Sequence, residues 1–209
     1  MAFLSDLVAE RQSRPGDPAA DVLTRLQQGD AGATLSQAEL LHHCIFLLNA
    51  GHETTTNLIG NGLHALLQHA AQLQRLVAEP ALIHSTVEAL LRFESPLQMN
   101  NREATAPLAI NARTLPAGTF ITLRVGAANR DAAAIAQTHA LDFTRKPNNH
   151  LAFGHGAHAC SGMNVARLEA RMAIGLLLAR YPRLAAVGAP ARDQRVRFRG
   201  LRHLPVKLC

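Results

Sequence analysis

The sequence lacks tryptophan and has only one tyrosine and seven phenylalanines among its 209 residues. Proteins that bind single-stranded nucleic acid stack the bases on aromatic rings, so this shortage argues against a nucleic-acid partner, although the formal net charge is +6. A group of arginines near the C-terminus could instead steer an acidic partner. Its members are Arg192, Arg195, Arg197, Arg199 and Arg202.

Cysteine and long apolar segments are also scarce. Cys44, Cys160 and Cys209 are an odd number of cysteines without the paired spacing of a disulfide framework. No apolar run reaches the roughly 18 residues that a membrane span needs. The opening residues 1–4 are not followed by the basic flank and apolar stretch of a signal peptide. We therefore expect a cytoplasmic protein without a membrane span.

Apolar residues recur mainly at helical spacing, which predicts a mainly α protein with short β strands and a single domain over 1–209. Short helices are expected over 3–12 and 21–28, and Ser36 and Glu39 form a capping box that opens a long helix over about 36–68. Further elements are a helix over about 81–94, small strands over about 101–126, a helix over about 161–181 and a terminal strand over 200–206. We expect the helix over 161–181 to bury one apolar face. That face consists of Val165, Leu168, Met172 and Leu176.

Polar residues interrupt the long helix at its middle, in the segment Ala50–Thr55. Glu53 and Thr54 place an acid and a hydroxyl in an apolar helix, where burial is costly unless each group has a partner or water. The segment is either a functional feature or a capping or kink feature in a core helix.

The segment Phe153–Gly162 is the most informative part of the sequence, because it places a single cysteine in a glycine-rich loop directly before a helical run. The positive end of that helix favours a thiolate at Cys160. Gly154, Gly156 and Gly162 allow sharp turns and a close approach of the backbone to a flat cofactor. The alternative reading is a glycine-rich turn that contains a buried free cysteine.

This segment resembles, without a gap, the haem-binding signature of the cytochrome P450 family of haem-thiolate monooxygenases, and Ala50–Thr55 resembles the oxygen-activation motif of that family's long distal helix. The resemblance covers nearly the whole chain but only the C-terminal half of the P450 fold. It implies haem b, with Cys160 as the axial iron ligand and Glu53 and Thr54 as the pair that delivers protons. It also implies a set of cofactor-binding residues, which are Arg102, Phe153, Gly154, His158 and Gly162.

The resemblance further implies a soluble bacterial enzyme that inserts one oxygen atom of O₂ into a small apolar substrate. Its electrons would come from a ferredoxin-type donor with a nicotinamide-dependent reductase. The family's structural Glu-x-x-Arg pair is altered here, because Arg92 is present but Ala89 occupies the position of the glutamate. Ala140 stands where a basic residue normally completes the triad. We expect Glu88 to pair with Arg92 at i, i+4 instead.

Two other functions are consistent with the sequence. The first is a non-catalytic, truncated remnant of such an enzyme that does not hold haem productively. The second is a small zinc site made from His155, His158 and Cys160, with His150 nearby.

Overall fold

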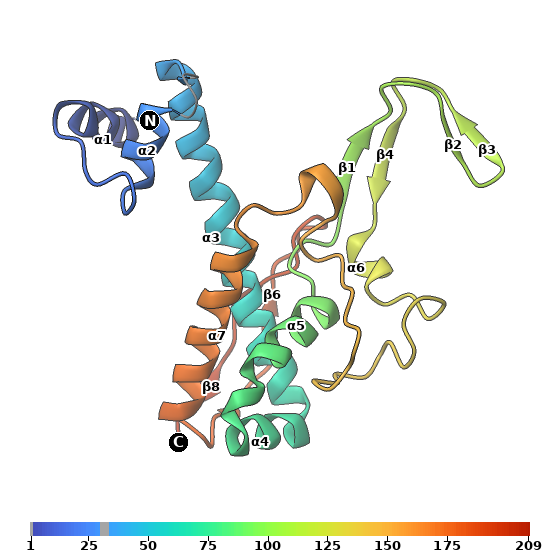
Figure 1. Cartoon of the computed structure of the whole chain (residues 1–209). Helices are drawn as coiled ribbons and strands as arrows, with labels where there is room; N and C mark the ends of the chain where they lie inside the picture. The colour runs from blue at the N-terminus through green and yellow to red at the C-terminus, as the bar shows by residue number, and fades with distance from the viewer. Residues whose placement is uncertain (1, 30–33) are drawn as a thin grey trace. The chain divides into compact units, whose positions relative to one another are not determined.

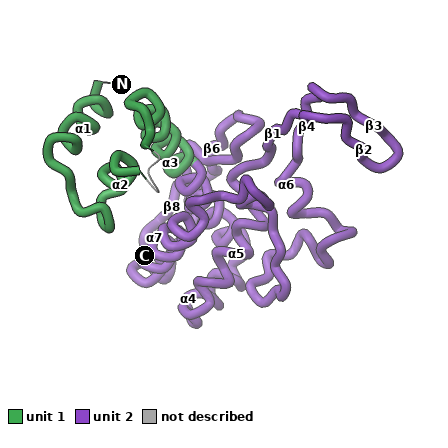
Figure 2. Tube along the Cα trace, turned by 45° about the horizontal axis from the view of Figure 1, so that its top comes forward, with its two compact units in different colours: residues 1–53 green, residues 54–209 purple. Residues whose placement is uncertain are grey.

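A computed structural model of the chain describes residues 2–29 and 34–209 (Figure 1). The chain divides into two compact units, residues 1–53 and residues 54–209 (Figure 2). The long helix α3 (Gln37–Gln68) contributes its first part to unit 1 and its second part to unit 2. The prediction of a single domain stays a prediction.

Unit 1 contains α1 (Ala2–Ser13), α2 (Val22–Gln28) and the start of α3. Asp21 caps α2, since its Oδ1 accepts a hydrogen bond from the Leu23 backbone N at 3.0 Å. Its Oδ2 also binds Arg11 of α1 at 2.7 Å. The capping box at the start of α3 is confirmed, because the Ser36 backbone N donates to Glu39 at 2.8 Å and the Glu39 backbone N donates back to Ser36 at 3.3 Å.

The helices of unit 2 are the second part of α3, α4 (Ala70–Ala78), the 3₁₀ turn η1 (Pro80–Leu82), α5 (Ile83–Phe93), α6 (Val125–Ala128), the 3₁₀ turn η2 (Gly156–His158) and α7 (Met163–Arg180). Helices α3, α5 and α7 lie side by side (Figure 1) and form the core. At their crossing a Cβ on Gly62 of α3 would lie 2.9 Å from Leu90 of α5 and 3.4 Å from Ile174 of α7. Glycine at this position therefore allows the three helices to approach closely.

Eight short strands form four antiparallel pairs in unit 2. β1 (Asn100–Glu103) pairs with β4 (Phe120–Leu123), and β2 (Leu108–Ile110) pairs with β3 (Arg113–Leu115). Near the C-terminus β5 (Ala185–Ala186) pairs with β8 (Val206–Lys207), and β6 (Ala191–Arg192) pairs with β7 (Leu201–His203). The β1–β4 ribbon continues into the β2–β3 hairpin, away from α4, α5 and α7 (Figure 1).

The face of α7 that the sequence predicted to be buried is exposed. Val165, Leu168, Met172 and Leu176 are between 54% and 65% exposed. The face that packs against the rest of unit 2 consists of Ala170, Ile174 and Leu178. Because α7 is apolar on both faces, its periodicity could not identify the side that packs.

In the part of the chain that the structure describes, no helix is both long and apolar enough to cross a membrane.

Candidate functional site

The loop before α7 has a fixed backbone and presents the Cys160 side chain at the surface. The Cys160 backbone N donates to the Phe153 carbonyl at 2.8 Å, and the Ala159 backbone N donates to the Gly156 carbonyl at 3.0 Å. Gly154 and Gly156 have φ values of +72° and +76°, which side chains rarely tolerate. Gly154 and Gly156 therefore make the sharp turns that return the chain to Cys160, whereas Gly162 has an ordinary φ of −85°.

A buried asparagine anchors the start of this loop. Asn129 accepts a hydrogen bond from the Leu151 backbone N at 2.6 Å and donates to the Ser95 hydroxyl at 2.8 Å. The residue is only 1% exposed, and each of its two polar side-chain atoms has a hydrogen-bond partner. Asn129 thus ties the loop to the end of α5.

A second anchor is the carboxylate of Glu88 on α5. Arg167 of α7 donates to it twice, from Nε at 2.7 Å and from Nη2 at 3.0 Å. His150 lies 3.1 Å away through Nε2. Burial opposes the charge of Glu88, but the hydrogen bonds from His150 and Arg167 outweigh it and lower the pKa to about 2. Glu88 is therefore a carboxylate at neutral pH.

The expected pairing of Glu88 with Arg92 is wrong. Arg92 points into the protein and is 1% exposed. Its guanidinium donates to the carbonyls of Asn129 at 3.2 Å, Thr138 at 2.8 Å and Ala140 at 2.7 Å. Burial lowers the pKa of Arg92, and so do the nearby charges of Arg145 and Arg130. The three carbonyls therefore take the place of a carboxylate as the hydrogen-bond acceptors of this guanidinium.

The other predicted cofactor-binding residues lie at or near the surface. Arg102 of β1 is half-buried, and its Nη1 donates to the Asn101 carbonyl at 2.8 Å. His158 is exposed and ends η2. A Cβ on Gly162 would lie 4.0 Å from the Cys160 sulfur, so the residue leaves space beside the thiol. Phe153 is half-buried, with its ring 4.7 Å from the Arg167 guanidinium carbon.

Glu53 and Thr54 are consecutive residues of α3, and each is half-buried. Glu53 ends unit 1 and Thr54 begins unit 2. Their role in proton delivery stays a prediction from the sequence.

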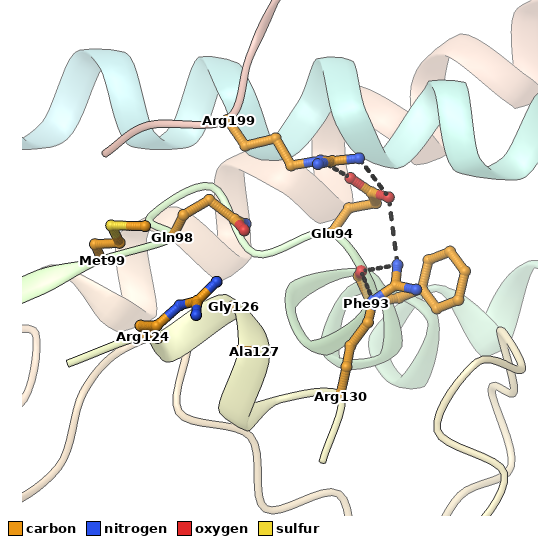
Figure 3. A pocket seen from close by; sticks show the side chains of 9 residues that line it. All are labelled: Phe93, Glu94, Gln98, Met99, Arg124, Gly126, Ala127, Arg130 and Arg199. Carbon is orange, nitrogen blue, oxygen red and sulfur yellow. Dashed lines mark hydrogen bonds and ion pairs between the residues drawn. The ribbon is translucent and has the colours of Figure 1, made fainter. Parts of the chain in front are cut away.

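An open pocket of about 410 Å³ is lined by none of the predicted catalytic or cofactor-binding residues (Figure 3). Glu94, at the end of α5, forms ion pairs there with Arg199 of the C-terminal segment and with Arg130. Arg130 also lies 4.0 Å from the centre of the Phe93 ring. These contacts hold the end of α5 to the segment after α6, through Arg130, and to the C-terminal segment, through Arg199.

Comparisons with known proteins show the family. The family model described as "Cytochrome P450" matches residues 3–185. This chain belongs to the cytochrome P450 family. It is 42% identical to the "Biotin biosynthesis cytochrome P450" of Bacillus subtilis (strain 168) over 99% of this chain and 52% of that relative. It is 43% identical to the "Vitamin D(3) 25-hydroxylase" of Pseudonocardia autotrophica, with the same two coverages.

Solved P450 structures share the fold. The crystal structure of "P450BioI in complex with hexadec-9Z-enoic acid ligated Acyl Carrier Protein" matches with a TM-score of 0.94 at 42% identity. The match covers 100% of this chain and 53% of that one. The mainly α fold class with short strands is thus confirmed as part of the P450 fold. The chain spans about half the length of the curated relatives it matches.

The residues around Cys160 fit a P450 haem. Such a haem takes one thiolate from the protein, and Cys160 offers an exposed thiol in a loop that is held by its own backbone. The glycines leave no side chain between the loop and a flat group. The zinc alternative does not fit, since the described residues contain no group of three His, Cys, Asp or Glu side chains that could hold a metal ion.

The pairing of Glu88 with Arg167 and His150 beside the Cys160 loop was not predicted from the sequence. The one available signal was the spacing of Arg167 and Arg171, which places two cations on the same side of the helix after Cys160. Nothing in the sequence shows that their partner is Glu88, because it lies 79 residues before Arg167.

Proposed function

We propose that this chain is a haem-thiolate protein of the monooxygenase type, in which the Cys160 thiolate would hold haem b. The observation that carries the proposal is the Cys160 loop, whose backbone turns at two glycines with positive φ and presents an exposed sulfur just before α7. When bound, the haem would supply oxygen activation for the insertion of one oxygen atom into a small apolar substrate.

The residues predicted from the sequence would each have one role, in holding the haem or in moving a proton. The Cys160 thiolate would donate electron density to the iron. Arg102 and His158 would bind the two propionates through charge-assisted hydrogen bonds. Phe153, Gly154 and Gly162 would form the wall of the loop. Glu53 would exchange a proton through its carboxyl group, and the Thr54 hydroxyl would pass it on.

The partners follow from the family rather than from any contact in the structure. We infer a ferredoxin-type electron donor with a nicotinamide-dependent reductase. A cytoplasmic location is consistent with the three cysteines, which are all free.

A carbon monoxide spectrum of the haem-loaded, reduced chain tests the proposal. A thiolate ligand shifts the Soret band strongly to the red, so we expect that band in the wild-type chain and its loss in Cys160→Ser. The matched controls are Cys44→Ser and Cys209→Ser, which should keep the band. Burial raises the pKa of the Cys44 thiol, which makes it a poor thiolate donor at neutral pH. A band that survives in Cys160→Ser would contradict the proposal.

The second candidate is a remnant that keeps the loop but does not hold haem productively. It is favoured by the exposed apolar face of α7 and by the described hydrogen bonds of Arg92, which go to backbone carbonyls and not to a carboxylate. This candidate predicts no red-shifted band in the wild-type chain or in any cysteine variant. The same spectra therefore distinguish the two functions.

A further inference from the structure

Glu88 is the centre of a cluster that joins α5, α7 and the Cys160 loop. Its carboxylate accepts the forked pair of hydrogen bonds from Arg167 and a third from His150. The side chains of Glu88, Arg167 and His150 are only 26%, 23% and 4% exposed. Arg171 also approaches the carboxylate, at 3.8 Å. A forked, half-buried arrangement fixes the direction of a guanidinium far better than a solvated ion pair does.

Both partners of Glu88 reach the loop at Phe153. The Arg167 guanidinium carbon is 4.7 Å from the centre of the Phe153 ring, within the range of a cation–π contact. The His150 ring centre is 5.8 Å from the Phe153 ring centre. Phe153 is also the residue whose carbonyl accepts the hydrogen bond from the Cys160 backbone N at 2.8 Å.

We propose that Glu88 is a positioning residue for Cys160, which acts by orienting Arg167 and His150 against Phe153 and so fixes the loop backbone at the cysteine. The ligand role of Cys160 rests on the function proposed above, but the positioning itself is a property of the chain without cofactor. The carboxylate one residue before Ala89 thus serves the loop and does not neutralise Arg92.

Hydrogen exchange of the chain without cofactor tests the positioning directly. In Glu88→Gln, which keeps the size of the side chain but loses its charge, the Cys160 amide should exchange about tenfold faster, because the loop opens more often. The Leu90 and Leu91 amides of α5 should keep their wild-type rates. Arg167→Lys keeps the charge but loses the fork, so it should give the same pattern. The double variant Glu88→Gln/Arg167→Lys should exchange the Cys160 amide at about the same rate as either single variant, because both changes break the same interaction.

Glu94→Gln is the control, since Glu94 is a buried glutamate at the end of α5 that also pairs with two arginines (Figure 3). Glu94 has no contact with the loop partners of Glu88 among the described hydrogen bonds and ion pairs. Its loss should leave the exchange of the Cys160 amide unchanged. The proposal would be overturned if Glu88→Gln and Glu94→Gln accelerated exchange of the Cys160 amide equally. It would also be overturned if Glu88→Gln accelerated exchange of the Cys160 and Leu90 amides equally.

The carbon monoxide spectrum separates this proposal from the function on which it rests. If the wild-type chain shows the thiolate band, Glu88→Gln should lower the share of haem in that form, whereas Glu94→Gln should not. An unchanged share in Glu88→Gln would overturn the positioning role. Absence of the band from the wild-type chain would overturn the proposed function, while faster exchange at Cys160 in Glu88→Gln would still support the positioning role.

Discussion

Arg92 is a buried cation whose described hydrogen bonds all go to backbone carbonyls. Three carbonyls accept from its terminal nitrogens, and its Nε has no hydrogen-bond partner among the described residues. Carbonyl dipoles satisfy hydrogen bonds but do not neutralise a charge, so the residue still carries the cost of burial. The Ala89 side chain, one helical turn earlier, is itself 1% exposed.

Ala89→Glu should therefore stabilise unit 2, because it places a carboxylate beside the buried guanidinium. We expect the free energy of unfolding to rise by about 1–3 kcal/mol, the range for hydrogen bonds to charged groups. Urea unfolding followed by circular dichroism measures the change. Ala89→Gln has the same size without the charge and should gain less. Equal gains in both variants would show that volume, not charge, is responsible.

The sequence predicts the backbone turn before Cys160, because the information for that turn is local. Cys160, Phe153 and Gly154 lie within eight residues, and the turn they make depends on backbone preferences that short spacings reveal. The partner of Glu88 could not be predicted in this way. A spacing of i, i+4 favoured Arg92, but that side chain points into the protein, and Glu88 meets residues 62 and 79 positions later. Only the packing of α5 against α7 decides this choice.

Among the elements, α7 shows how the two faces of one helix differ in what they contribute. Ile174 is 0% exposed and contacts the core beside Gly62, whereas Leu168 is 56% exposed. The sequence located the helix and its apolar residues but assigned the wrong side to the core. Helix α4 is also not predicted from the sequence, although Leu73, Leu76 and Val77 recur there at helical spacing.

Ile174→Ala should cost about 2–5 kcal/mol of unfolding free energy, since it removes buried methyl groups and leaves a cavity at the crossing of three helices. Leu168→Ala removes a side chain of similar size from the exposed face and should stay within about 0.5 kcal/mol of wild type. Thermal and urea unfolding of the two variants measure the difference. Similar losses would mean that both faces are packed.

At the scale of the whole molecule, the chain combines half the length of its P450 relatives with a long apolar stripe on α7. Exposed apolar patches of this kind drive association in water. The stripe includes no residue that packs in the core, so charges placed there should change association without changing folding. The stripe is formed by Val165, Leu168, Met172 and Leu176.

Leu168→Lys combined with Leu176→Lys should therefore reduce self-association of the purified chain, because two charges interrupt the apolar stripe at positions that are 56% and 65% exposed. Sedimentation velocity over a range of concentrations measures the mass, and a thermal melt checks that folding is unchanged. The control is Val187→Lys with Val196→Lys, which adds the same charge at exposed positions outside α7. If this control reduces association equally, net charge explains the effect and the α7 stripe has no special part in it.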